Sequence, residues 1–128
     1  MNYYIAKTVE MEFKQAISKI TEQLKLQGFG IITEINLSAT LKKKLDKDIP
    51  AYRILGACNP NYAYEAVINE PQIGVMLPCN VIVRDLDNNK VEIAAIDPIA
   101  SMMAIENQNL HGFAQEVKAL LEKAVLGV

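Results

Sequence analysis

Two cysteine–asparagine pairs stand at breaks in otherwise apolar segments, and they are the residues with the clearest potential for chemistry. The first is Cys58-Asn59 in YRILGACNP, residues 52–60, and the second is Cys79-Asn80 in IGVMLPCNVIV, residues 73–83. A thiol can act as a nucleophile or as a metal ligand, and an amide offers both a hydrogen-bond donor and an acceptor. If the two pairs meet in the fold, they form a small pocket with directed hydrogen bonds and a reactive sulfur.

The spacing of the cysteines limits the metal chemistry that they can support. Cys58 and Cys79 are 21 residues apart, which is far longer than a Cys-x-x-Cys redox motif or zinc knuckle allows. A metal site would have to be assembled in space from Cys58, Cys79 and His111 or a methionine. The alternative is that both thiols fill the core, because free cysteine is among the most buried residue types.

Two charged residues extend the candidate site. Arg53 precedes Cys58 by five residues in the same predicted strand, and a donor or cation near a thiol favours the thiolate. Asp97 precedes Pro98, so its carboxylate is expected to cap the helix that the proline begins, or else to pair with Arg53 or bind a ligand group. The candidate ligand-binding residues are therefore Arg53, Cys58, Asn59, Cys79, Asn80 and Asp97, and the candidate catalytic residues are Cys58 and Cys79.

Composition and missing motifs exclude several classes of function. The chain has 128 residues, 51% apolar and 22% charged, and its formal net charge is −2, so no field-driven attraction to nucleic acid or to an anionic membrane is indicated. No Ser-His-Asp arrangement, Walker loop, GxGxxG or HExxH is visible, and no cofactor is assigned. Neither a secretory signal nor a membrane-spanning stretch is apparent, which predicts a cytoplasmic protein with reduced thiols.

The elements that must position these residues can be read from periodicity and capping. Residues 2–8 are predicted to form a strand, and residues 9–27 a helix that Thr8 caps and Gly28 ends. A strand at 29–35 leads to a short helix at 37–45, capped by Asn36. Lys42 to Lys44 on that helix are expected to lie in water.

In the second half of the chain, a cap residue followed by proline occurs twice, and each pair predicts the start of a helix. A strand at 52–58 precedes a helix at 60–69 that Asn59 and Pro60 begin, and Asp97-Pro98 begins another at 98–105. Pro78 predicts a sheet edge or a bulge, and residues 87–89 form the turn of a hairpin. Asn109 caps the last helix, whose apolar stripe consists of Leu110, Phe113, Ala114, Val117, Leu120, Leu121 and Ala124.

These elements predict one α+β domain spanning residues 1–128. Its core order is strand, helix, four strands, helix, with short helices inserted. The layers are a curved, mostly antiparallel sheet of about five strands and two long helices packed on one face.

Four segments together resemble a known family. GFGIITEINLSATLKKKL, YRILGACNP, IGVMLPCNVIV and VEIAAIDPIASMM look like the bacterial and archaeal family called domain of unknown function 302, over nearly the whole chain. The resemblance implies a TATA-binding-protein-like α+β fold and association as a homodimer, but no activity and no DNA binding. The positions that match its pattern are Arg53, Gly56, Cys58, Asn59, Pro60, Pro78, Cys79, Asn80, Asp97 and Pro98.

Three functional hypotheses follow. The leading one is a small homodimeric binding or sensing domain whose Cys-Asn pocket holds a small ligand or a metal. The second is a structural or partner-interaction module without a ligand, for which Met102, Met103 and Ile105 offer an apolar surface. The third is a thiol-dependent enzyme in which Arg53 lowers the pKa of Cys58 or Cys79. A role other than catalysis is expected.

Overall fold

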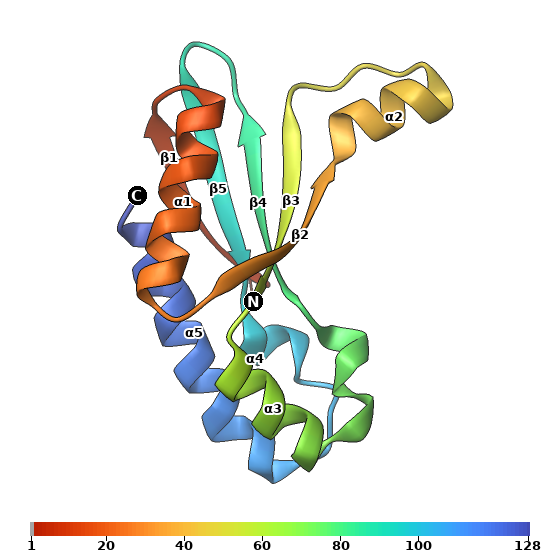
Figure 1. The fold of residues 1–128 in the computed structure, drawn as a ribbon, viewed down its shortest axis with the longest axis vertical. Coiled ribbons are helices and arrows are strands. Elements are labelled where there is room, and N and C mark those ends of the chain that lie inside the picture. Colours follow the sequence, from red (N-terminus) through yellow and green to blue (C-terminus); the bar gives the residue numbers. More distant parts are fainter. Residues whose placement is uncertain (1) are drawn as a thin grey trace.

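One antiparallel sheet of five strands organises the protein. The computed structural model describes residues 2–128, and the strand order in the sheet is β1-β5-β4-β3-β2 (Figure 1). Every neighbouring pair is antiparallel. The strands are β1 (Tyr4–Glu10), β2 (Gly30–Asn36), β3 (Tyr52–Cys58), β4 (Cys79–Asp85) and β5 (Lys90–Ile96).

Two long helices, α1 (Phe13–Leu26) and α5 (His111–Leu126), cover one face of this sheet. The inward positions of β4 and β5 alternate with outward ones, as a half-covered strand requires. Their side chains pack against apolar stripes of the two helices at the helical period. The fully buried members of this main core include Ile20, Leu24, Leu55, Val81, Val83, Val91, Ile93 and Leu121.

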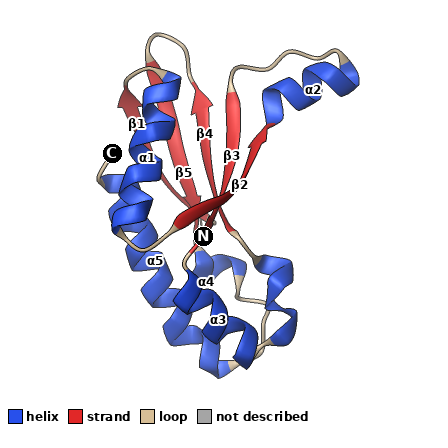
Figure 2. Ribbon diagram, viewed as in Figure 1, coloured by secondary structure: helices blue, strands red, loops and turns tan. Residues whose placement is uncertain are grey.

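The shorter helices form a separate lobe beyond one end of the sheet. It contains α3 (Pro60–Asn69), the 3-10 turn η1 (Pro71–Met76), α4 (Pro98–Ser101), the 3-10 turn η2 (Gln108–Leu110) and the start of α5 (Figure 2). This lobe has its own small core of Ala66, Ile73, Met102, Leu110 and Ala114. Phe113 packs against both cores and so links the lobe to the main body.

The helix α2 (Leu37–Leu45) extends away from the body and contains no buried residue (Figure 1). Its cap agrees with the prediction, because the Asn36 side chain accepts a hydrogen bond from the Ala39 amide at 3.0 Å. Lys42 to Lys44 are exposed, as predicted.

The predicted α+β fold, with two long helices on one face of an antiparallel sheet, is confirmed. The bounds predicted for the strand at 52–58 and the helix at 60–69 agree with the structure, and the hairpin joins β4 to β5. Gly28 adopts a φ of 88° just after α1, as a left-handed helix stop requires. Among residues 2–128, no helix combines the length and the apolar character needed to cross a membrane.

Several local predictions were wrong. Thr8 does not cap α1, because β1 continues through it and pairs it with Glu92, and α1 begins only at Phe13. Asn59 precedes α3 without a side-chain cap bond, and its Nδ2 donates to the Gln27 carbonyl of the α1–β2 connection. Asn109 does not cap α5: Asn107 caps the preceding 3-10 turn instead, and α5 starts at His111.

The prediction for Pro78 was also wrong, because this proline lies neither on an edge strand of the sheet nor in a β-bulge. It lies immediately before β4, a central strand between β3 and β5, so the missing proline N–H falls outside the ladder. The helix predicted over 98–105 ends at Ser101.

On the second face of the sheet, no helix within residues 2–128 covers β4 and β5, whose main helix contacts are with α1 and α5 on the first face. The residues that point to it alternate with the core residues, and they are more apolar than a solvated strand face requires. Ala94 is buried here at 6% exposure, among half-buried isoleucines of neighbouring strands. We call this surface the open face; its central members are Tyr52, Ile54, Ile82, Arg84, Glu92, Ala94 and Ile96.

Candidate functional site

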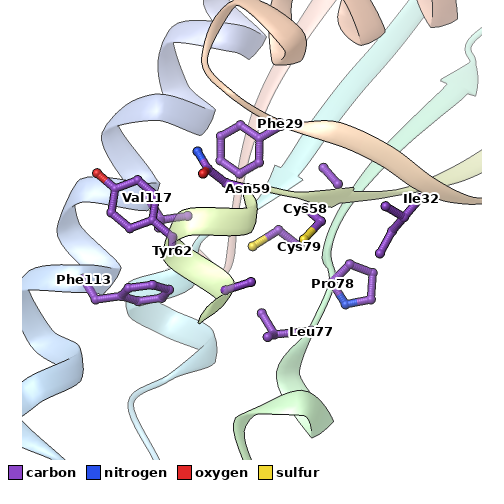
Figure 3. A pocket seen from close by; sticks show the side chains of 12 residues that line it. Phe29, Ile32, Cys58, Asn59, Tyr62, Leu77, Pro78, Cys79, Phe113 and Val117 are labelled. Atoms are coloured by element: carbon purple, nitrogen blue, oxygen red, sulfur yellow. The ribbon is translucent and has the colours of Figure 1, made fainter. Parts of the chain in front are cut away.

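A cavity of about 220 Å³ lies where the end of the sheet meets the helical lobe. Figure 3 shows its lining side chains, with the sulfur atoms of Cys58 and Cys79 among them. None of the lining residues carries a charge. They are Phe29, Ile32, Ala57, Cys58, Asn59, Tyr62, Ala63, Leu77, Pro78, Cys79, Phe113 and Val117, and we call this the sheet-end cavity.

The local sequence explains why two thiols meet here. Cys58 is the last residue of β3, and Cys79 is the first residue of β4, so both lie at the same end of an antiparallel pair. Pro60 at the first position of α3 turns the chain away from the sheet directly after Asn59. The cavity occupies the space that this turn leaves beside the strand ends.

Asn59 supplies the one side-chain amide of the cavity, and the α1–β2 connection holds it. Its Nδ2 donates a hydrogen bond to the Gln27 carbonyl at 3.3 Å. A Cβ atom at Gly28 would lie only 3.0 Å from the same Nδ2, so glycine leaves room for this contact as well as for the positive φ. Since Nδ2 is occupied by Gln27, Oδ1 is the end of the amide that a ligand can use as an acceptor.

The two thiols differ in their surroundings. Cys79 is 8% exposed, whereas Cys58 is half-buried. Burial raises the pKa of the Cys79 thiol to about 11, and the neighbouring Cys58 adds to the effect. Both cysteines are free. Cys79 is therefore a neutral thiol at ordinary pH, the opposite of an activated nucleophile.

An aromatic pair forms the wall on the helical side. The rings of Tyr62 in α3 and Phe113 in α5 meet edge to face with centroids 5.5 Å apart. A hydrogen bond to the Glu116 carboxylate raises the pKa of Tyr62 and keeps its hydroxyl protonated. Because Phe113 belongs to both cores, this wall joins two separately packed parts of the molecule.

The structure brings together three of the predicted site residues, Cys58, Asn59 and Cys79. Arg53 lies five residues from Cys58 along β3, about 17 Å in an extended strand. Its guanidinium donates to the Glu34 carboxylate at 3.0 Å and lies 6.0 Å from the centre of the Phe13 ring. It therefore pairs with Glu34 and Phe13 and not with the thiols, and it is absent from the cavity lining.

Asn80 and Asp97 also lie outside the cavity. Asn80 pairs with Gly56 in the ladder and points to the open face, because strand side chains alternate and Cys79 takes the covered face. The Asp97 carboxylate accepts a hydrogen bond from the Ile99 amide at 2.9 Å, the capping role that the sequence predicts, and pairs with Lys118 at 2.9 Å.

The remaining candidate residues, His111 and the two methionines, also lie outside the sheet-end cavity. His111 lies at the start of α5 beside a different hollow, shared with Met102 and Met103. Residues 2–128 contain no group of three or more His, Cys, Asp or Glu side chains able to hold a metal ion. Met102 is buried in the lobe's core, which corrects its assignment to an exposed apolar surface, whereas Met103 is 66% exposed.

Sequence reasoning missed most of the apolar lining. Phe29, Tyr62 and Phe113 come from three distant segments, and each fits an ordinary core position in its own element. The proline after Asn59 was the available signal, since it requires α3 to begin abruptly beside the two strand ends.

Fold and site together define a small α+β protein with a half-covered antiparallel sheet and an apolar, thiol-containing cavity at one end. The family model described as Domain of unknown function DUF302 matches residues 5–127, and the chain belongs to this family.

One solved structure shares the whole architecture. It is the crystal structure of an uncharacterized conserved DUF302 protein from Bacillus stearothermophilus, with a TM-score of 0.89 and 22% sequence identity. The similarity covers 96% of this chain and 95% of that one. At this identity the likeness establishes the fold. A comparison with curated proteins finds no match.

Proposed function

We propose that the protein binds a small, uncharged and largely apolar molecule in the sheet-end cavity. The observation that carries this proposal is the lining of the cavity: apolar and aromatic side chains, two thiols and one amide, without a charged group. A charged ligand would lose its hydration there without a compensating partner, so the lining selects against it. A neutral ligand with one hydrogen-bond donor could use the Asn59 Oδ1.

The size of the cavity sets the size of the ligand. Drug-sized ligands occupy pockets of roughly 300–1,000 Å³, whereas an apolar cavity of about 150 Å³ accepts benzene. At about 220 Å³, the sheet-end cavity fits a molecule of one or two small rings. If the six to ten heavy atoms of an unoptimised probe supply about 4–5.5 kcal/mol of binding free energy, the Kd is about 0.1–1 mM.

A cavity-filling variant tests this assignment. Ala63 lines the cavity from α3, and Ala63→Leu places extra methyl groups into it. Benzene, phenol and indole are titrated against the protein, with backbone amide NMR shifts as the readout. We expect saturable shifts around the cavity and at least a tenfold weaker Kd in Ala63→Leu.

Val67→Leu is the matched control, because Val67 lies on the same helix, is 45% exposed and does not line the cavity. This variant should bind as the parent does. Shifts that do not saturate, or that persist unchanged in Ala63→Leu, would overturn the proposal.

We further propose that the open face joins two copies of the chain. Its apolar positions form one side of a hollow of about 530 Å³, whose charged groups Arg84 and Glu92 pair with each other at 2.7 Å. Since this pair is self-neutralising, two identical surfaces meet there without like-charge repulsion, as a twofold contact requires.

Sedimentation equilibrium tests the dimer. We expect a dimer that Ile82→Glu converts to monomer, because this substitution places a charge at the centre of the open face. Ile68→Glu is the control on the exposed surface of α3, where Ile68 is 64% exposed, and it should remain dimeric. A monomeric parent protein would contradict the proposal.

A further inference from the structure

Cys58 and Cys79 lie next to each other diagonally across two paired strands. Cys79 is the register partner of Ala57, and Cys58 is the following residue of β3. Strands about 4.8 Å apart with a rise of about 3.4 Å per residue place the two Cα atoms about 6 Å apart. Residues joined by a disulfide have Cα atoms roughly 4.4–6.8 Å apart, so the backbone already has the required spacing.

The side chains also reach a common space. In a regular ladder, Cys58 and Cys79 would point to opposite faces. Both nevertheless line the sheet-end cavity, because β3 ends at Cys58 and the chain turns into α3. Figure 3 shows the two sulfur atoms in the middle of the lining side chains.

We propose that Cys58 and Cys79 are a redox pair that a small, uncharged disulfide converts into an intramolecular disulfide bond. The Cys58 thiolate attacks one sulfur of the small disulfide, forms a mixed disulfide and releases one small thiol. Cys79 then loses its proton and attacks the Cys58 sulfur, which forms the internal bond and releases the second small thiol. The protein loses two protons and two electrons, and the small disulfide gains them.

The order of the two steps follows from the accessibility of the thiols. Cys58 is half-buried and meets the reagent first, whereas Cys79 is 8% exposed. The raised pKa of Cys79 suits a thiol that waits in neutral form beside the mixed disulfide. The apolar lining favours an uncharged reagent over a charged one, since no lining residue offers a counter-charge.

The bond would close a loop that contains α3 and η1, and therefore Tyr62, Ala63 and Leu77 of the cavity wall. This part of the inference rests on the proposed function: a molecule that fills the cavity covers the thiols and slows their oxidation. At ten times its Kd, a probe leaves about one tenth of the protein empty, so oxidation should slow about tenfold.

The test uses the full chain and 2-hydroxyethyl disulfide at neutral pH, followed by alkylation and intact-mass measurement. We expect the parent protein to lose the mass of two hydrogens and to resist alkylation, with Cys58 and Cys79 joined in one peptide. Cys79→Ser should stop at the mixed disulfide on Cys58. Cys58→Ser should react at least tenfold more slowly, and Cys58→Ala replaces it if the serine variant does not fold.

A parent protein that stops at the mixed disulfide, stays fully alkylatable or forms only intermolecular disulfides overturns the redox pair. The same experiment with saturating indole separates the two proposals. Oxidation that proceeds equally with and without indole counts against ligand occupancy of the cavity, while the internal disulfide itself still supports the redox pair.

Discussion

The Asp97 carboxylate lies 2.9 Å from the Lys118 ammonium, so the end of β5 is tied to the middle of α5. The other carboxylate oxygen accepts the Ile99 amide at the start of α4. Together these contacts hold the start of α4, and with it the lobe, against the end of β5 and α5. The hydrogen bond to Asp97 also raises the pKa of Lys118, which keeps the ammonium charged.

Substitutions of Asp97 should affect stability and not probe binding. Asp97→Ala removes the cap and the charge, and we expect a loss of about 1–2 kcal/mol in the free energy of unfolding. Asp97→Asn retains a good cap residue, so its loss should be smaller. Denaturant unfolding measures both values, and a tenfold loss of indole binding in folded Asp97→Asn would show that Asp97 acts at the site.

Gly56 should tolerate no side chain. A Cβ atom there would collide with the Thr33 Oγ1 and lie 2.7 Å from the Pro78 Cγ, between two neighbouring strands. Gly56→Ala should therefore lower the free energy of unfolding by about 1–3 kcal/mol. Gly30→Ala is the matched control in β2, because nothing lies within 4 Å of its Cβ position. Equal denaturation midpoints for the two variants would contradict the crowding argument.

Alkaline pH should destabilise the protein through Cys79. Burial raises the pKa of this thiol from an ordinary value of 9.0 to about 11, so the folded state holds the proton more tightly. The contribution to stability is complete below about pH 9, and it falls as the pH rises towards 11, by about 2–3 kcal/mol in all.

The measurement is denaturant unfolding in a reducing buffer at several pH values between 7 and 10. Cys79→Ala lacks this titration and should lose less stability than the parent over the same range, whereas Cys58→Ser keeps the buried Cys79 and should lose more than Cys79→Ala does. Parallel curves for the parent and Cys79→Ala would contradict the raised pKa.

Asn59 should distinguish ligands by their hydrogen-bond donors. Since its Nδ2 is held by Gln27, its Oδ1 is the acceptor offered to the cavity. Asn59→Ala should weaken the binding of phenol by about 0.5–1.5 kcal/mol, the usual net value of one hydrogen bond. The binding of benzene, which has no donor, should be nearly unchanged. Amide NMR titrations give both constants, and an equal effect on phenol and benzene would show that Asn59 acts only through packing.

The sequence predicted regular elements well because their signals are local. The helical stripe of α5 and the run of β3 each depend on residues close in the chain. Caps were less predictable: Asn36 and Asp97 cap as expected, but Thr8 is drawn into β1 by its pairing with Glu92. Pairing Thr8 within the sheet stabilises the fold more than one capping hydrogen bond at the start of α1 would.

For the cavity, too, local features could be predicted from the sequence and long-range ones could not. The sequence by itself determined that two Cys-Asn pairs stand at strand ends and that Pro60 forces the chain away from the sheet. Only the tertiary structure decided that Cys58, Asn59 and Cys79 share a cavity while Asn80 faces the other side and Arg53 lies at the far end of β3. The physical reason is twofold. Strand register and the alternation of side chains decide which residues adjacent in sequence point to opposite faces of the sheet. The long-range packing of Phe29, Tyr62 and Phe113 decides which residues distant in sequence line the same cavity.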